Sequence, residues 1–310
     1  MAPSELDDRL LEAVHAPSAL TQGDVGRGLA LSDAAGWNQT AEDWALFIAA
    51  GRALGIRDGS GLLVATAATL HYGARAWISL VLVDAAARHR GLASGLMRRC
   101  IAVIEADGAI PCLDATPAGA SVYRTIGFLP GFEFERWQSN GTCAATTDQG
   151  EAKARWPGLE AKSASTLDSI AKLDREASGL ERRSVLASLL GRPETRAWLA
   201  ADGKGFVIAR EGRRAWQIGP LVAADDAQAI ALLDSAVADL QTAPAGSAPA
   251  SLDPAPRAIL IDVPTQRRSI TGPLAQRGFV SQRPFVRMAL GAVPPPLDAR
   301  SFALAGPEYG

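Results

Sequence analysis

The sequence has few of the residues that build metal sites and disulfide frameworks. It contains three cysteines and three histidines in 310 residues. Cys100, Cys112 and Cys143 match neither a metal-ligand spacing nor a disulfide framework. Cys100 falls on the apolar stripe of an expected helix and Cys112 in an expected strand, so we expect both to be packed thiols.

Long apolar runs and a surplus of one charge are also missing. No apolar run reaches the roughly 20 residues that a membrane span requires, and the first residues lack the basic and apolar regions of a signal peptide. The formal net charge of −2 argues against a nucleic-acid binder, which usually shows a concentrated basic excess. We therefore expect a cytoplasmic protein with neither a nucleic-acid nor a membrane partner.

The chain has enough apolar residues for two ordinary domains, since 48% of it is hydrophobic and a domain takes roughly 100–200 residues. The capping signals Thr21-x-x-Asp24 and Thr40-x-x-Asp43 open the first two helices. In the first half we expect helices at 21–35, 40–50 and 92–108, a short helix from 116, and strands at 52–57, 61–71, 76–83, 109–115 and 128–137. In the second half we expect helices at 165–177, 182–190 and 227–240, and strands at 205–209, 215–218, 258–263 and 284–290.

The stretch 78–108 organises the chain around a strand, a basic loop and a helix. Its apolar run 80–83 is short and β-branched, as a buried strand requires. Apolar residues then recur on one helix face, which Gly108 is suited to end. The intervening loop, 88–93, precedes the first helical N–H groups, which have no partner within the helix and lie at the positive end of its dipole. Such an end binds phosphate, and Gly91 and Ala93 keep the backbone open to a pyrophosphate.

Two patterns resemble a known family. Arg88-x-x-Gly91-x-Ala93, after a strand ending in Val-Asp, resembles the acetyl-coenzyme A signature Arg/Gln-x-x-Gly-x-Gly/Ala of the GNAT acetyltransferase superfamily. Downstream, Tyr123-x-x-x-Gly-Phe matches the family's second motif in the family's order and separation. On these residues the chain is identified as a member of that superfamily. The resemblance implies an α+β fold with a mixed, mostly antiparallel central sheet flanked by helices.

The resemblance also implies where acetyl-coenzyme A binds. In GNAT enzymes the strand ending at Val83 splays from its neighbour, here near Asp114, so that free amides of Leu82 and Val83 would meet the pantetheine and the thioester oxygen. A tyrosine placed like Tyr123 lies beside the thioester sulfur, and its phenol, with an unperturbed pKa of about 10 against a thiol's ~8.5, would supply the proton to the thiolate or hydrogen-bond the sulfur; alternatively, the tyrosine packs on the sheet. The expected contacts with this co-substrate, which needs no metal, are Val81, Leu82, Val83, Arg88, His89, Arg90, Gly91, Leu92, Ala93, Ser94, Asp114, Ala118 and Gly119.

In this family the loop between the first two helices walls the acceptor site. The resemblance therefore makes Trp37, Asn38 and Trp44 candidate substrate contacts, and His71, at a strand end, a candidate contact and general base. Trp44 could instead be a core residue of its helix, and His71 could be solvent-exposed. Many enzymes of this kind move the proton through water, so a missing base would not count against the resemblance.

The second half repeats the first in outline, and we expect two GNAT-like domains in tandem. The expected divisions are an acetyl-coenzyme A domain at 1–140, a linker at 141–155, a degenerate domain at 156–292 and an extended tail at 293–310, whose apolar residues 302–304 could dock on either domain. At the phosphate-facing loop the second copy reads Ala223-Ala-Asp-Asp-Ala227, without glycine and with two carboxylates that would repel a pyrophosphate by roughly a few kcal/mol. Leu274 replaces the tyrosine. We expect this copy to be inactive in transfer.

The resemblance implies an N-acetyltransferase that moves an acetyl group from acetyl-coenzyme A to a primary amine of a small molecule or peptide by direct attack in a ternary complex. The alternative is a non-catalytic coenzyme A-binding sensor or interaction module. A nucleotide-phosphate enzyme is disfavoured because no Gly-x-x-x-x-Gly-Lys-Ser/Thr pattern occurs. The protein could act as a monomer or a homodimer.

Overall fold

The computed structural model describes residues 17–141, 164–241 and 257–310, which form two compact units. The first unit comprises the described residues up to Leu113 together with Tyr309, and the second runs from Asp114 to Glu308 and includes Gly310. The division therefore lies upstream of the expected linker at 141–155. Nearly all of that linker, and Cys143, lie outside the described residues.

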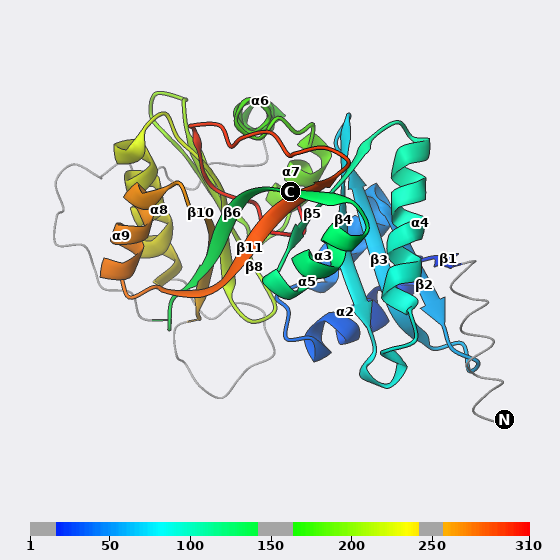
Figure 1. Cartoon of the computed structure of the whole chain (residues 1–310). Helices are drawn as coiled ribbons and strands as arrows, with labels where there is room; N and C mark the ends of the chain where they lie inside the picture. Colours follow the sequence, from blue (N-terminus) through cyan, green and yellow to red (C-terminus); the bar gives the residue numbers. More distant parts are fainter. Residues whose placement is uncertain (1–16, 142–163, 242–256) are drawn as a thin grey trace. The chain divides into compact units, whose positions relative to one another are not determined.

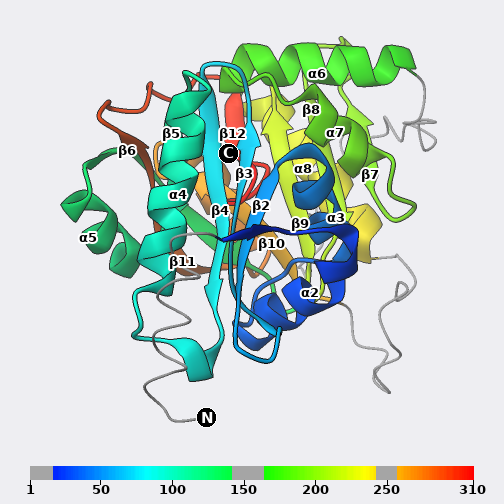
Figure 2. The same ribbon diagram turned by 90° about the vertical axis from the view of Figure 1, so that its right-hand side faces the viewer.

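The first unit is a sheet with helices on both faces. Strands β1 to β4 are antiparallel neighbours in chain order, and β5 joins β4 in parallel. Helix α4 covers one face, while α2 and α3 cover the other (Figures 1 and 2). The strands are β1 (Ser18–Ala19), β2 (Arg52–Arg57), β3 (Leu63–His71), β4 (Arg75–Val83) and β5 (Ile110–Ala115). The helices are η1 (Gln22–Asp24), α2 (Val25–Ala34), α3 (Ala41–Ala50), η2 (Ala85–Ala87) and α4 (Leu92–Ala106).

Capping residues set where the first helices begin. The backbone N–H of Thr21 donates to Asp24 at 2.9 Å, and that of Thr40 donates to Asp43 at 2.8 Å. Both are capping boxes, which satisfy N–H groups that a helix start leaves unpaired. The helices predicted from these two signals are confirmed. Within the described ranges, no helix has both the length and the apolar character needed to cross a membrane.

The second unit repeats the strand–helix–strand order of the first. Strands β7, β8 and β9 are antiparallel, and β10 joins β9 in parallel after α8. Helices α8 and α9 pack on one face of this sheet, and α6 and α7 on the other (Figure 1). The strands are β7 (Arg196–Leu199), β8 (Phe206–Glu211), β9 (Trp216–Val222), β10 (Ile259–Pro264), β6 (Phe128–Gln138), β11 (Val280–Leu290) and β12 (Ser301–Ala303). The helices are α5 (Pro117–Thr125), α6 (Ala164–Ser178), α7 (Arg183–Leu190), α8 (Asp226–Gln241) and α9 (Arg268–Gln276). The predicted α+β class, with a mixed and mostly antiparallel sheet, is confirmed.

Strand β6 belongs to the second unit, not to the first domain in which it was expected. It lies between β10 and β11 and is antiparallel to both. The Phe134 ring stacks on the Phe285 ring with centroids 5.1 Å apart. The Arg136 guanidinium donates two hydrogen bonds of 2.8 Å to the fully buried carboxylate of Asp262. Alternating apolar residues predict a strand, but they do not identify its partners, which explains the difference.

Two strands of the second unit were not expected. Strand β7 is four residues long, too short for a clear alternation, and β12 lies in the Pro-rich tail that we expected to be extended. Phe302 and Leu304 are buried, and β12 pairs with β9. The apolar part of the tail therefore docks on the second unit.

The buried Arg136–Asp262 pair predicts a large stability difference. Replacing Asp262 with Ala leaves a buried guanidinium unpaired, and we expect the second unit to lose about 3–5 kcal/mol of unfolding free energy. Asp168→Ala, which breaks an ion pair whose side chains are more than half exposed, should lose at most about 1 kcal/mol. Urea unfolding of both variants tests this, and equal losses would contradict it.

Candidate active site

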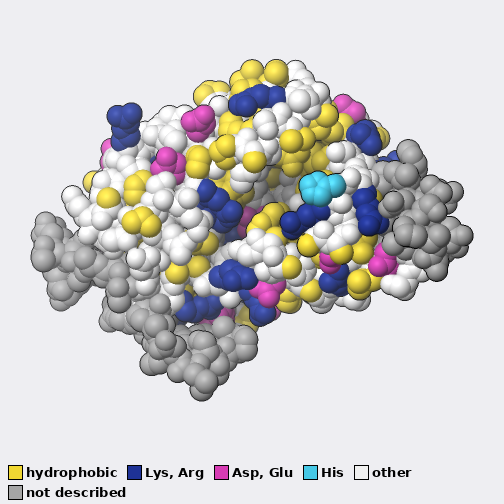
Figure 3. All heavy atoms as spheres, turned by 60° about the horizontal axis from the view of Figure 1, so that its bottom comes forward, with side chains coloured by type: hydrophobic (Ala, Val, Ile, Leu, Met, Phe, Trp, Pro, Cys, Tyr) yellow, Lys and Arg dark blue, Asp and Glu magenta, His cyan; other side chains and the backbone are white. Residues whose placement is uncertain are grey.

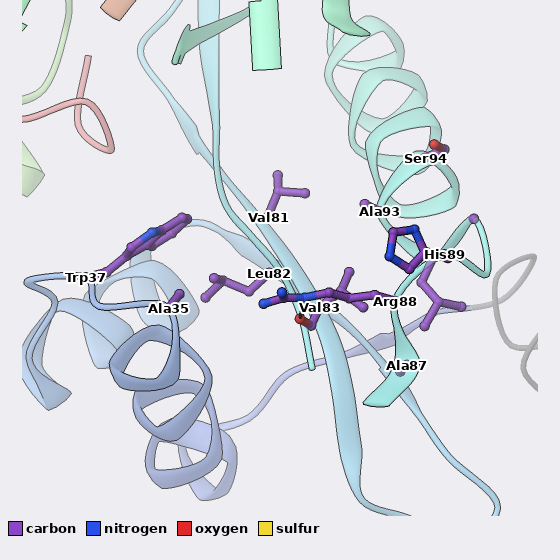
Figure 4. A pocket seen from close by; sticks show the side chains of 12 residues that line it. Ala35, Trp37, Val81, Leu82, Val83, Ala87, Arg88, His89, Ala93 and Ser94 are labelled. Atoms are coloured by element: carbon purple, nitrogen blue, oxygen red, sulfur yellow. Dashed lines mark hydrogen bonds between the residues drawn. The ribbon is translucent and has the colours of Figure 1, made fainter. Parts of the chain in front are cut away.

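A pocket of about 500 Å³ opens in the first unit where β4 ends and α4 begins. Its walls come from the end of α2, the last residues of β4 and the loop into α4. Figure 4 shows Trp37 on one side, His89, Ala93 and Ser94 on the other, and Val81 and Leu82 between them. The lining residues are Ala35, Trp37, Val81, Leu82, Val83, Ala87, Arg88, His89, Gly91, Leu92, Ala93 and Ser94.

Glycine at position 91 suits the backbone conformation. Gly91 is the N-cap of α4 and has a φ of 74°, in the left-handed region that side chains disfavour. A Cβ atom added there would meet no other protein atom within 4 Å. The space beside Gly91 is therefore open, and it adjoins the first-turn N–H groups of α4, which have no partner within a helix. This combination suits an anion.

Strand β4 contains a bulge just before the pocket. Thr66 pairs with Leu82 and Ala68 with Ser79, so that Leu80 and Val81 together face one residue of β3. Leu80 has a φ of 52°, which is rare for a residue with a side chain. The bulge changes the direction of the backbone at the point where β4 starts to line the pocket.

The parallel ladder between β4 and β5 is short. It runs from Arg75–Ile110 to Trp77–Cys112 and stops. On that side, β4 beyond Trp77 has no ladder partner in β5, as expected for a splayed strand pair. Main-chain groups of the last β4 residues are therefore available to a ligand.

An ion pair ties α2 to the entrance of the loop. Arg27 donates from Nη2 to Asp84 at 2.6 Å and from Nε to the Leu63 carbonyl at 2.9 Å. The other Asp84 oxygen accepts from the Ala86 N–H at 3.1 Å and so caps η2. The Ala86 N–H and the Arg27 guanidinium hold the pKa of the Asp84 carboxyl below its ordinary value. One carboxylate thus connects the helix that precedes Trp37 with the loop that precedes Gly91.

Positive charge lies at the rim of the pocket. Arg88 and His89 are exposed, and the Nε of Arg88 donates to the Val83 carbonyl at 3.4 Å. The space-filling view shows dark blue side chains beside a cyan histidine (Figure 3). A charged rim of this kind favours an anionic ligand.

The structure brings most of the expected co-substrate contacts together. The pocket lining includes nine of those residues and the acceptor candidate Trp37, while Ala35 and Ala87 were not expected. Arg90 and Asn38 are partly buried and are not among the lining residues. The alanines gave no sequence signal, because small apolar residues are abundant throughout this chain.

Two acceptor candidates lie elsewhere. Trp44 is fully buried, its ring packs over Gly28, and its Nε1 donates to Ser32 at 3.2 Å, so it is a core residue of its helix. His71 pairs with Ala76, five residues before Val81 along β4 and therefore roughly 16 Å from it at ~3.3 Å per residue. The His71 ring faces Asp107 at 3.5 Å, and burial lowers its pKa. We therefore withdraw both residues as acceptor contacts.

Four further candidates belong to the second unit. The Asp114 carboxylate is fully buried and accepts two hydrogen bonds from Arg287, at 2.9 and 2.8 Å, which is a structural role. Ala118 and Gly119 lie in the first turn of α5. Tyr123 lies on the same helix with its ring 6.0 Å from Phe128, and burial raises the pKa of its phenol.

In the second unit, the chain itself fills the positions that correspond to the pocket. The β9–β10 ladder stops at Ile218, and β12 then pairs with Leu221 and Val222. Pro220, in the bulge of β9, has no N–H to offer. Asp225 accepts from the Gln228 N–H at 2.8 Å, so it caps α8 where an anion would bind. Strand β12 and Asp225 thus occupy the strand edge and the helix N-terminus that the first unit leaves open.

Among the described residues, no cluster of histidine, cysteine, aspartate and glutamate is suited to hold a metal ion. Cys100 and Cys112 are buried free thiols, and burial raises the pKa of Cys100 to about 12. Neither thiol is a candidate nucleophile, because a reactive cysteine needs a lowered pKa and access.

Comparisons with known proteins place the fold. Residues 170–244 match the domain model described as an acetyltransferase (GNAT) domain. A solved structure from Pyrococcus horikoshii, assigned as an acetyltransferase, is 18% identical with a TM-score of 0.74 over 95% of each chain. A GCN5-related N-acetyltransferase from Sphaerobacter thermophilus is 16% identical with a TM-score of 0.58, over 92% of this chain and 98% of that one. A tandem GNAT protein of the clavulanic acid biosynthesis pathway is 15% identical with a TM-score of 0.59, over 90% of this chain and 99% of that one. No curated protein matches the chain.

The fold is that of the GNAT acetyltransferases. The match to the GNAT domain model lies in the second half of the chain, and the structural likenesses extend the GNAT fold over most of its length. The matched segment contains none of the residues 80–128 that carried the resemblance in the sequence. The comparisons support acyl transfer as the general activity.

The Arg27–Asp84 pair predicts a pH-dependent stability difference. A carboxyl whose pKa is lowered by folding contributes stability above its unfolded pKa of about 3.9 and loses that contribution as the pH falls through the folded value. Asp84→Asn keeps an acceptor for Ala86 but removes the charge. We expect this variant to be about 1 kcal/mol less stable than the parent at pH 7 and the difference to shrink below pH 4. Denaturant unfolding at several pH values tests this, and a difference that does not change with pH would contradict it.

Proposed function

We propose that the protein is an N-acetyltransferase. It transfers the acetyl group of acetyl-coenzyme A to a primary amine of a small molecule or peptide by direct attack in a ternary complex. The observation that carries this proposal is the pocket itself, which joins an unpaired β4 edge to an open helix N-terminus behind a left-handed glycine.

The residues present fit the co-substrate. The open space at Gly91 and the first-turn amides of α4 suit a diphosphate, and the rim arginine supports its charge. The last β4 residues offer main-chain groups to an amide-containing arm such as pantetheine. When bound, acetyl-coenzyme A supplies an acetyl group activated as a thioester.

Groups of the chain contribute to the steps of the transfer. The pocket binds both reactants, so that the amine nitrogen forms a bond to the acetyl carbon while the carbon–sulfur bond breaks. Main-chain N–H groups of β4 stabilise the negative charge that develops on the carbonyl oxygen. The amine loses one proton, which leaves through water, and the sulfur gains one. The products are an N-acetylated amine and the free thiol.

Tyr123 is the proposed proton donor to the sulfur. Its place in the Tyr-x-x-x-Gly-Phe motif supports this role, and burial raises the pKa of its phenol. The phenol therefore keeps its proton at neutral pH, as a general acid must.

Trp37 is the proposed acceptor contact. Its ring lies on the pocket wall opposite α4 (Figure 4), where an aromatic face can attract a cationic or apolar amine. We further propose that the protein acts in the cytoplasm as a monomer or homodimer without a nucleic-acid or membrane partner. Its formal charge of −2 supports the absence of a nucleic-acid partner.

One assay separates the enzyme from a non-catalytic coenzyme A-binding module. Amines are screened by thermal shift in the presence of coenzyme A, and the hits are tested for thiol release from acetyl-coenzyme A. Release with at least one primary amine supports the proposal. Tight binding of coenzyme A without turnover across a broad panel would instead favour the module.

Gly91→Glu should abolish coenzyme A binding and leave the fold intact. The new carboxylate enters the open space at the start of α4 and repels the diphosphate. Gly108→Glu is the matched control, because Gly108 also has a positive φ and open space, and it lies beyond the other end of α4. By calorimetry we expect a loss of affinity above roughly 100-fold for the first variant, a few kcal/mol of charge repulsion. The control should match the parent, and unchanged affinity in Gly91→Glu would refute the proposed diphosphate site.

Tyr123→Phe should lower turnover much more than co-substrate affinity. Removing a general acid lowers kcat by roughly 10²–10⁴-fold, while the ring still packs on Phe128. The dissociation constant of coenzyme A should stay within about twofold of the parent's, since the phenol acts only on the reacting sulfur. Tyr72→Phe, in which a buried phenol of the first unit loses its hydroxyl, is the control. Equal kcat values for both variants would remove Tyr123 from the mechanism.

A further inference from the structure

One buried hydroxyl holds the bulge of β4. The Oγ1 of Thr66 donates to the carbonyl oxygen of Leu80 at 2.8 Å. Thr66 is fully buried in β3, and Leu80 is the bulge residue with a φ of 52°. The bulge removes part of the regular ladder between the two strands, so this side-chain bond satisfies a carbonyl that the ladder leaves out.

The same bond fixes the direction of an N–H group. The Leu80 carbonyl and the Val81 N–H belong to one planar trans peptide, in which the two groups point in opposite directions. Because the carbonyl points at Thr66, the Val81 N–H points away from Thr66. Val81 lines the pocket, whereas Thr66 does not.

Loss of this bond would weaken the strained bulge. A left-handed φ is unfavourable for a residue with a Cβ atom, and the buried Leu80 carbonyl would lose its partner. The peptide could then rotate toward an ordinary strand conformation, which would turn the Val81 N–H out of its present direction.

We propose that Thr66 is a positioning residue for acetyl transfer. Through the Leu80 carbonyl it holds the Val81 N–H in the direction from which that group donates to the thioester oxygen of the co-substrate. The inference rests on the proposed function, and it concerns the acetyl group alone: coenzyme A without an acetyl group lacks the thioester carbonyl to which this N–H donates.

The test compares two ligands on three variants. Thr66→Val removes the hydroxyl and keeps the shape, Thr66→Ser keeps the hydroxyl, and Thr69→Val removes a buried hydroxyl of the same strand that faces His71 instead. Calorimetry gives the dissociation constants of acetyl-coenzyme A and coenzyme A. We expect Thr66→Val to weaken the binding of acetyl-coenzyme A about fivefold and that of coenzyme A less than twofold. The same variant should lower kcat at least ~10-fold. Thr66→Ser and Thr69→Val should behave like the parent.

A second measurement needs no variant. In the parent protein, acetyl-coenzyme A should slow amide hydrogen exchange at Val81, whereas coenzyme A should leave it unchanged. If the parent binds neither ligand, the proposed function fails and the inference fails with it. If the parent binds both but Thr66→Val affects them equally or not at all, or Val81 responds to both alike, the positioning role alone is overturned. If Thr66→Val does not fold, the behaviour of Thr66→Ser and the hydrogen exchange at Val81 decide whether Thr66 has the positioning role.

Discussion

The end of the β4–β5 ladder is the constraint on which the first unit's site depends. A buried strand normally satisfies its main-chain groups with neighbours on both sides, yet the parallel pairing stops at Trp77 and Cys112. The bulge at Leu80, held from β3 by Thr66, lets β4 continue in another direction without leaving its carbonyl unpaired. The pocket therefore follows from how one strand loses one partner, and the side chains around it are mostly small or apolar.

The second unit shows what happens when the same gap is closed. Its parallel ladder also stops early and its strand β9 also carries a bulge, but β12 takes the place beside Leu221 and Val222. At Gly219 an added Cβ would lie 1.9 Å from the Leu304 carbonyl, so the tail backbone runs directly against the bulge. Asp225 completes the closure by capping α8. The two units thus share a topology and differ in whether the chain or a ligand satisfies the same groups.

Features of the fold and of the site that depend on neighbouring residues could be predicted from the sequence. The capping boxes at Thr21 and Thr40 and the left-handed Gly91 depend on neighbouring residues only, and the sequence pattern located each of them. Features that depend on distant partners were not predictable. The partners of β6 are decided by residues far away in the chain, and Leu80 looks like any leucine in an apolar run. The site was foreseen where a motif of consecutive residues forms it, and missed where two strands form it together, as at Thr66 and Leu80.

The position of β6 has a consequence for how the gene can be divided. Because this strand precedes the expected linker in the sequence yet fills the middle of the second sheet, a fragment started at that linker would contain β10 and β11 with nothing between them. Two hydrophobic strands with unpaired edges invite association with other chains. The repeat visible in the sequence is thus not a pair of interchangeable parts, and shuffling the halves among related proteins requires the donor's β6 to travel with the second half.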